Sequence, residues 1–139
     1  MSTKKEKIAR KVDQWRGHDG DPHFRGYFDC FNRGLYYEAH DVLEQLWLKD
    51  RHGPNGSFYK GLIQLAGAFV HLQKNHLSPA AALFKLAAAN LKNYPARHEQ
   101  IDLRELRDLT ARWLAELEAS GFKVNPLAET NRPKISWPA

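Results

Sequence analysis

The sequence predicts an all-α domain, a compact antiparallel bundle of four to five main helices joined by short loops. In the long segments, apolar residues recur at the i, i+3, i+4, i+7 spacing of one buried helix face. Clusters rich in glycine, proline and asparagine separate these segments. No segment alternates apolar and polar residues convincingly, so no strand is expected.

The first three helices are bounded by recognisable breakers. A short amphipathic helix is expected over residues 4–16, followed by the turn sequence GHDGDP. Asp21 before Pro22 predicts the N-cap and first turn of the second helix. Gly34 suits a left-handed C-cap that ends this helix. The third helix then covers about residues 36–49.

The later helices also carry cap signals. Ser57 is the predicted N-cap of a long apolar helix over residues 58–74. Ser78 before Pro79 predicts the start of the next helix. Asp102, with a glutamate three residues later, predicts the N-cap of the last helix.

The chain of 139 residues is expected to have three parts. These are a basic N-terminal arm with a short helix at 1–20, a helical domain at 21–120 and an irregular, proline-containing tail at 121–139. In the tail, Ile135 and Trp137 are expected to pack on the body of the domain. Shifted by 42 residues, the first half of the chain weakly matches the second, which favours tetratricopeptide-like helical hairpins as a variant of the bundle. The matching pairs are Tyr27 with Phe69, Phe28 with Val70, Ala39 with Ala81 and Val42 with Phe84.

The net charge of +5 is concentrated at one end of the chain. Residues 1–16 hold six basic and two acidic side chains, whereas the rest holds 15 basic and 14 acidic ones. The body therefore lacks the basic field of a nucleic-acid-binding domain, and only the arm could contact phosphates or anionic lipid. A solvated helix with a basic bias is the favoured interpretation of that arm.

The sequence predicts a cytoplasmic protein. The single cysteine, Cys30, permits no internal disulfide and is expected to be a buried thiol. No apolar run approaches the roughly 18 residues of a membrane span. The start, MSTKKEKIAR, has no apolar stretch of the secretory type.

A candidate site lies on the third helix. On a helical wheel, His40 and Glu44 fall on the flank of the buried arc, beside Trp47. Groups on such a flank are partly shielded from water, which favours perturbed protonation. Asp41 falls on the opposite side and is expected to point away from His40.

The apolar helix over residues 58–74 carries a polar stripe made by Lys60, Gln64 and His71. An unpaired buried polar group costs about 1–3 kcal/mol, so the stripe needs partners. We expect it to face His40 and Glu44, and Gly67 within it permits a close approach of the two helices.

Three interpretations of this cluster are open. In a structural one, Lys60 pairs with Glu44 and the imidazoles bond to Gln64 or to carbonyl groups. In a functional one, the cluster binds a small ligand, with His40 as acid or base and Glu44 holding its tautomer. In a third, a divalent metal binds to His40, Glu44 and His71. The candidate ligand-binding residues are Tyr37, Trp47, Lys60, Gln64 and His71.

The leading functional hypothesis is a small-ligand-binding protein, with catalysis by His40 and Glu44 as an extension of it. The alternative is a helical-repeat-like interaction or self-association module in which the same residues are structural. A metal-binding protein is a less favoured alternative. No glycine-rich phosphate loop, cysteine pair, HExxH or GxSxG motif is present, so the sequence names no reaction.

The residues His40-x-x-x-Glu44-x-x-Trp47 resemble the signature of a bacterial and archaeal family, the domain of unknown function 309. The blocks FNRGLYYEAHDVLEQLW and FYKGLIQLAGAFVHL resemble its two conserved blocks, over about residues 24–94. Asp41 departs from the pattern, since relatives often carry glutamate there. The resemblance implies a compact, single-domain helical fold and no established activity, and it singles out His40, Glu44 and Trp47.

Overall fold

The computed structural model describes residues 3–18 and 20–139, which form six helices and one small sheet. Along the chain these are α1 (Lys4–Asp13), α2 (Pro22–Asn32), α3 (Tyr36–Asp50), α4 (Gly56–Gln73), α5 (Leu77–Leu91), β1 (Arg97–His98), β2 (Ile101–Asp102) and α6 (Leu103–Ala119). The all-α prediction is confirmed.

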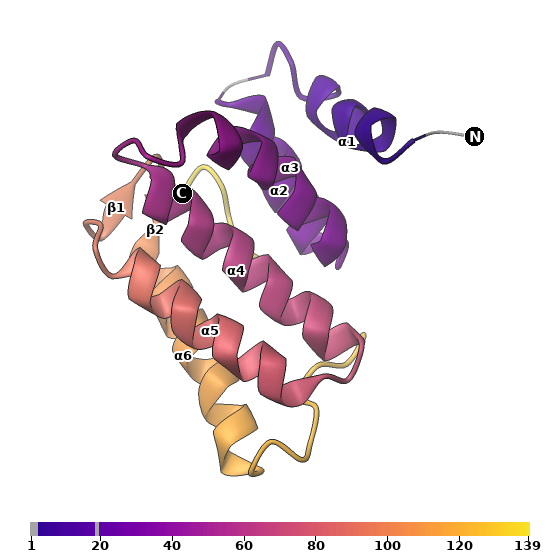
Figure 1. Cartoon of the computed structure of the whole chain (residues 1–139), viewed down its shortest axis with the longest axis vertical. Coiled ribbons are helices and arrows are strands. Elements are labelled where there is room, and N and C mark those ends of the chain that lie inside the picture. The colour runs from indigo at the N-terminus through magenta and orange to yellow at the C-terminus, as the bar shows by residue number, and fades with distance from the viewer. Residues whose placement is uncertain (1–2, 19) are drawn as a thin grey trace.

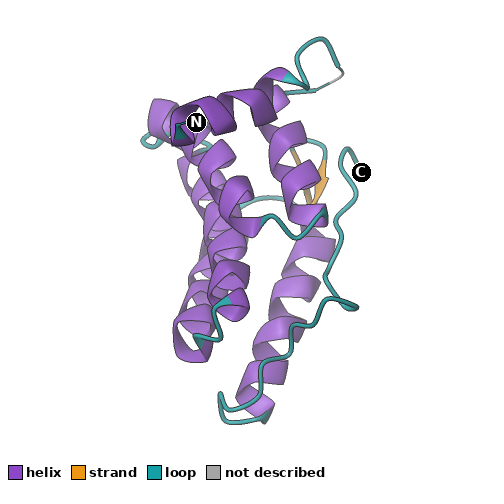
Figure 2. Cartoon of the chain, turned by 90° about the vertical axis from the view of Figure 1, so that its right-hand side faces the viewer, coloured by secondary structure: helices purple, strands orange, loops and turns teal. Residues whose placement is uncertain are grey.

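The helices pack mainly against their neighbours in the chain. The α3, α4 and α5 helices lie side by side in one layer, with α4 in the middle (Figure 1). Behind this layer, α2 packs on α3 and α6 packs on α5. Figure 2 shows the same bundle from the side, with the C-terminal segment running along it as a loop. The central position of α4 explains why its sequence is apolar nearly all round.

The core centres on Phe69 of α4, which is fully buried. Its ring lies 5.0–5.5 Å, centroid to centroid, from one aromatic ring of each of the four other main helices. These rings belong to Phe31 on α2, Tyr36 on α3, Phe84 on α5 and Trp113 on α6. One side chain therefore connects both layers of the bundle.

Two predicted caps are wrong by one or two residues. The α4 helix begins at Gly56, so Ser57 lies inside it, and the N-cap Asn55 makes no side-chain capping bond. The Tyr94 hydroxyl instead accepts from the Phe58 N–H at 3.1 Å, so a tertiary contact replaces the cap. Likewise α5 begins at Leu77, which puts Ser78 in its first turn. The predicted caps Asp21 and Asp102 both accept backbone N–H groups of their helices.

The strand pair was not expected from the sequence. Arg97 pairs with Asp102 and His98 with Ile101, in antiparallel register. Two residues a strand are too few for an alternating pattern, so no periodic signal marks them.

The C-terminal tail is held on α2. The Asn32 side chain donates to the Ile135 carbonyl at 2.8 Å and accepts from the Ile135 N–H at 2.7 Å. The Trp137 ring stacks on Phe28 at 5.8 Å, while the Arg25 guanidinium lies 4.9 Å from its centre. The tail thus packs on aromatic side chains of α2.

The α1 helix is docked rather than solvated, contrary to the favoured interpretation of the basic arm. Ile8 and Val12 are buried and pack against Val42 of α3. Gly26 of α2 makes the approach possible, because an added Cβ atom would lie 3.0 Å from the Lys11 carbonyl oxygen and 3.2 Å from a Val42 methyl group. Because Ile8 and Val12 bury one stripe of the helix, the basic side chains lie on the remaining faces of α1.

Candidate functional site

The central pair of the candidate site is His40 and Asp41, which are adjacent on α3. The Nδ1 atom of His40 lies 3.0 Å from a carboxylate oxygen of Asp41. Asp41 is only 6% exposed, and its second oxygen lies 3.4 Å from the Nζ atom of Lys4 on α1. The prediction that Asp41 points away from His40 and into solvent is therefore wrong.

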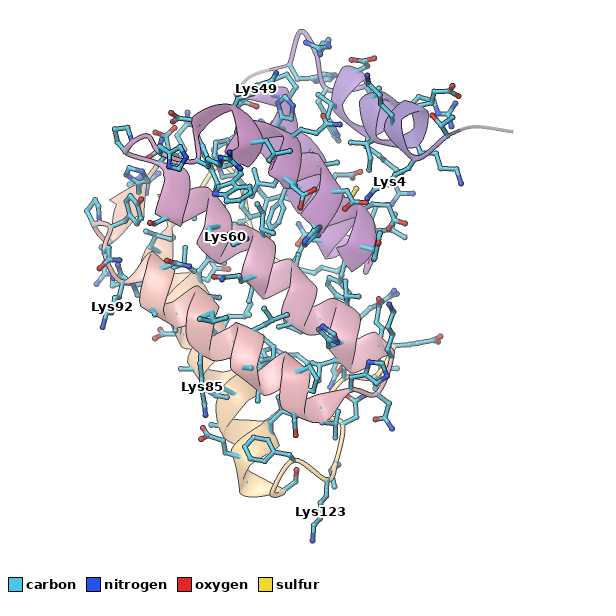
Figure 3. The ribbon with its side chains drawn as sticks, in the orientation of Figure 1. Lys4, Lys49, Lys60, Lys85, Lys92 and Lys123 are labelled. Carbon is cyan, nitrogen blue, oxygen red and sulfur yellow. The ribbon has the colours of Figure 1, made fainter. Side chains whose placement is uncertain are left out.

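Docking of α1 explains this difference. The wheel of α3 places Asp41 opposite the core, but α1 covers that side of the helix through Ile8 and Val12. Figure 3 shows Lys4 at the edge of α1 that faces α3. The neighbouring Asp41 carboxylate raises the pKa of Lys4, with smaller contributions from Tyr37 and Glu44.

The pairing of Asp41 with both His40 and Lys4 selects the tautomer of the His40 imidazole. A carboxylate that also pairs with a lysine can only accept hydrogen bonds, so His40 donates its Nδ1 proton to Asp41. In the neutral ring, Nε2 then carries the lone pair. Within the described residues Nε2 has no hydrogen-bond partner, and it is not a fully buried atom. It is therefore free to accept a proton or a hydrogen bond from a molecule in solution.

The predicted role of Glu44 as the group that holds the tautomer is taken by Asp41. Within residues 3–18 and 20–139, Glu44 makes no hydrogen bond or ion pair. Its carboxylate stays half-buried one helical turn from His40, close enough to affect Lys4 electrostatically.

Tyr37 flanks the imidazole on its solvent side. Its ring is 52% exposed and lies 6.4 Å from the His40 ring, centroid to centroid. The ammonium groups of Lys4 and Lys74 lie 5.8 and 5.9 Å from the centre of the same ring. Lys74 is the C-cap residue of α4, so this tyrosine connects α1, α3 and the end of α4.

Trp47 and Lys60 are brought together, but not as an ion pair with Glu44. The Lys60 ammonium lies over the Trp47 ring, 4.4 Å from its centre, and Figure 3 shows Lys60 near the middle of the helix layer. The ion pair between Lys60 and Glu44 that the structural interpretation predicts is therefore not formed. The aromatic face is the partner because a cation can lie over it without losing access to water.

The rest of the polar stripe on α4 divides between neighbours. The Gln64 side chain accepts from the Asn90 amide of α5 at 2.7 Å, so it faces α5 rather than His40. The His40 ring lies near Gly67 of α4, where an added Cβ atom would be 4.0 Å from its Cδ2 atom. The same added atom would meet Leu83 of α5 at 3.2 Å. His40 therefore reaches the predicted helix but not the predicted side chains.

His71 lies against His76, whose ring centroid is 5.8 Å away, at the turn between α4 and α5. Its Nδ1 atom is buried and has no hydrogen-bond partner within the described residues. Burial lowers the pKa of His71 below its ordinary value, and the charges of His76 and Lys74 lower it further.

This shift predicts a pH dependence of stability. The unfolded chain protonates His71 at about pH 6.5, whereas the folded protein resists protonation, so the free energy of unfolding falls as pH drops below about 6.5. We expect H71Q to show a shallower decrease between about pH 7.5 and 5.5 in urea denaturation. The exposed His52 gives the control, since H52Q should keep the slope of the unmodified protein. Equal slopes for the unmodified protein and H71Q would contradict the assignment.

The predicted metal ligands are not brought together. In the described part of the chain, no three His, Cys, Asp or Glu side chains are placed to hold a metal ion. His40 bonds to Asp41, while His71 lies against His76 at the far end of α4. In this arrangement His40, Glu44 and His71 do not form a metal site.

Residues 24–92 match the family described as Domain of unknown function (DUF309). The chain belongs to this family. An Aquifex aeolicus (strain VF5) protein, described as an uncharacterized protein, is 30% identical over 78 residues. That alignment covers 56% of this chain but 23% of the relative, so the chain spans less than a quarter of the relative's length. No solved structure matches the chain significantly.

The DUF309 match includes almost all of α2 and all of α3, α4 and α5. It therefore contains His40, Asp41, Glu44 and the polar stripe of α4, whereas Lys4 and the whole of α1 lie outside it. No helix in the described residues of this DUF309 chain is both long and apolar enough for a membrane span.

Proposed function

We propose that this protein binds a small polar ligand at the α3 and α4 surface and that His40 accepts a hydrogen bond or a proton from it. The supporting observation is the bond from His40 Nδ1 to the buried carboxylate of Asp41, which leaves Nε2 as an oriented acceptor. A histidine held in this way is suited to general base chemistry at neutral pH.

The surroundings define the class of ligand. Lys4 and Lys74 are balanced by Asp41 and Glu44, so the formal charge of these groups is zero. A neutral or zwitterionic molecule with a hydroxyl or ammonium donor fits this balance better than a polyanion. The half-exposed Tyr37 ring supplies a flat apolar surface beside the imidazole.

The test is an NMR screen with ring-labelled histidine. Small polar fragments are titrated, and we expect binders to shift the His40 ring signals. For these fragments H40Q should weaken binding about tenfold or more, the equivalent of about 1.4 kcal/mol. The matched variant H52Q, changed at an exposed histidine after α3, should bind as the unmodified protein does. Binders that perturb only other residues would refute the proposed site.

A second candidate function, self-association or docking of another protein, is supported by exposed apolar side chains on α3 and α5. Tyr37 and Leu48 on α3 and Leu86 on α5 are each about half-exposed, at 52%, 55% and 50%. The matched relative is also much longer than this chain, so there the matched region is only part of a larger protein. Sedimentation of the same samples measures the oligomeric state, which separates association from small-ligand binding at His40. A dimer whose His40 ring signals do not respond to any fragment would favour docking.

A further inference from the structure

A second candidate site lies between α1 and the start of α3. A surface cleft of about 430 Å³ is open there, and it shares no residue with the His40 cluster. It is lined by Lys7, Arg10, Lys11 and Gln14 on and just after α1, and by Leu35 and Glu38 at the start of α3. Its volume lies within the range of small-molecule sites.

The cleft gathers three of the six basic side chains of residues 1–16, whereas residues 17–139 hold 15 basic and 14 acidic ones. Three cationic side chains and one carboxylate line it. The three cations lie on adjacent turns of one helix, so their charges converge on the same small volume. An anion that bound here would gain charge-assisted hydrogen bonds from several donors at once.

The helix that carries these cations is held in place. Its N-terminus has a capping box, in which the Thr3 hydroxyl accepts from the Glu6 N–H at 3.1 Å and the Glu6 carboxylate accepts from the Thr3 N–H at 3.3 Å. Ile8 and Val12 anchor its apolar stripe on Val42. Binding therefore requires little ordering of the backbone, although the lysine side chains lose some rotamer freedom.

We propose that this cleft binds a small ligand that carries several phosphate groups. A chain of phosphates can meet Lys7, Arg10 and Lys11 together, and the Gln14 amide supplies a further donor. Glu38 opposes the cations across the cleft, and it would repel a phosphate strand that continued past them. The observations therefore favour a compact polyphosphate over a nucleic-acid strand.

The experiment measures binding of inorganic tripolyphosphate to the full-length chain by calorimetry at low salt, where exposed charges interact most strongly. The variant K7Q/K11Q should weaken binding about tenfold or more. The matched pair K85Q/K92Q loses the same charge on α5 and at its C-cap, away from α1 in Figure 3, and should bind as the unmodified protein does. E38Q should bind tripolyphosphate more tightly, because it removes the opposing carboxylate.

Two further ligands distinguish the sources of phosphate. A nucleoside triphosphate is expected to bind at least as tightly as tripolyphosphate, whereas a single-stranded oligonucleotide should bind more weakly per molecule. Tighter oligonucleotide binding that K7Q/K11Q abolishes would overturn the small-ligand proposal in favour of a nucleic-acid surface. Equal loss in K7Q/K11Q and K85Q/K92Q would overturn the cleft as the site. H40Q should leave tripolyphosphate binding unchanged, so this proposal and the His40 proposal fail independently.

Discussion

Replacing Phe69 with alanine is expected to lower the free energy of unfolding by about 3–5 kcal/mol, because it removes the ring that all the main helices share. Phe69 is fully buried, and its four aromatic neighbours come from four different helices. These neighbours cannot all move inward, since each is fixed by its own helix, so the cavity will not close. Urea denaturation followed by circular dichroism measures the loss.

The control for Phe69 is Phe122, which follows α6 and is 38% exposed. F122A removes the same atoms from a site that water already reaches, so we expect a change of less than about 1 kcal/mol. A domain of this size has about 5–15 kcal/mol of stability in all, so F69A removes a large share of it. F69L keeps most of the volume and should show a smaller loss in the same direction. Equal stabilities of F69A and F122A would contradict the central role of Phe69.

The sequence was sufficient to predict this part of the fold. The helix around Phe69 is apolar on nearly every face, and only a central helix in a layered bundle can bury such a surface. The 42-residue match also paired Phe69 with Tyr27, and both side chains are fully buried. The matched segments lie in the α2–α3 and α4–α5 hairpins, so similar burial in the two hairpins accounts for the weak sequence match.

The candidate site was harder to predict, because a helical wheel treats each helix alone. It placed His40 correctly on the flank of α3, and the ring does lie near Gly67 of α4. It could not show which neighbour each polar side chain would face, and Gln64 turned to Asn90 of α5 instead. The wheel gives the angle of a side chain, whereas the packing of the adjacent helices decides its partner.

The partners of Asp41 were also not predictable from the α3 wheel alone, because one of them lies on α1. The burial of Asp41 depends on α1, and the charge of α1 suggests a solvated helix rather than one docked on the site. Ile8, Val12 and Trp15 were a usable signal, since an apolar stripe on a short helix needs a surface to cover. The surface that this stripe covers is on α3, and the same contact brings Lys4 next to Asp41.

Replacing Asp41 with alanine is expected to lower the free energy of unfolding by about 1–2 kcal/mol, because the His40 Nδ1–H then loses a buried acceptor. The larger effect should be on the imidazole itself. Without the carboxylate, nothing selects the tautomer with the proton on Nδ1, so the ring nitrogen signals of His40 in NMR spectra should shift toward an average of both tautomers. Any fragment that binds through Nε2 should also lose affinity.

The control for this change is D108A on α6. Asp108 is exposed and also lies inside a helix, so both substitutions gain the same helix propensity and differ only in the contacts they remove.

D41N keeps an oxygen that can accept from Nδ1, and it should therefore preserve the tautomer better than D41A while losing the charge that attracts Lys4. K4Q removes only an exposed partner of that carboxylate and should leave the His40 signals nearly unchanged. If D41A instead left both stability and the His40 ring signals as they are in the unmodified protein, the buried carboxylate would not orient the imidazole. The proposed acceptor at Nε2 would then lose its physical basis.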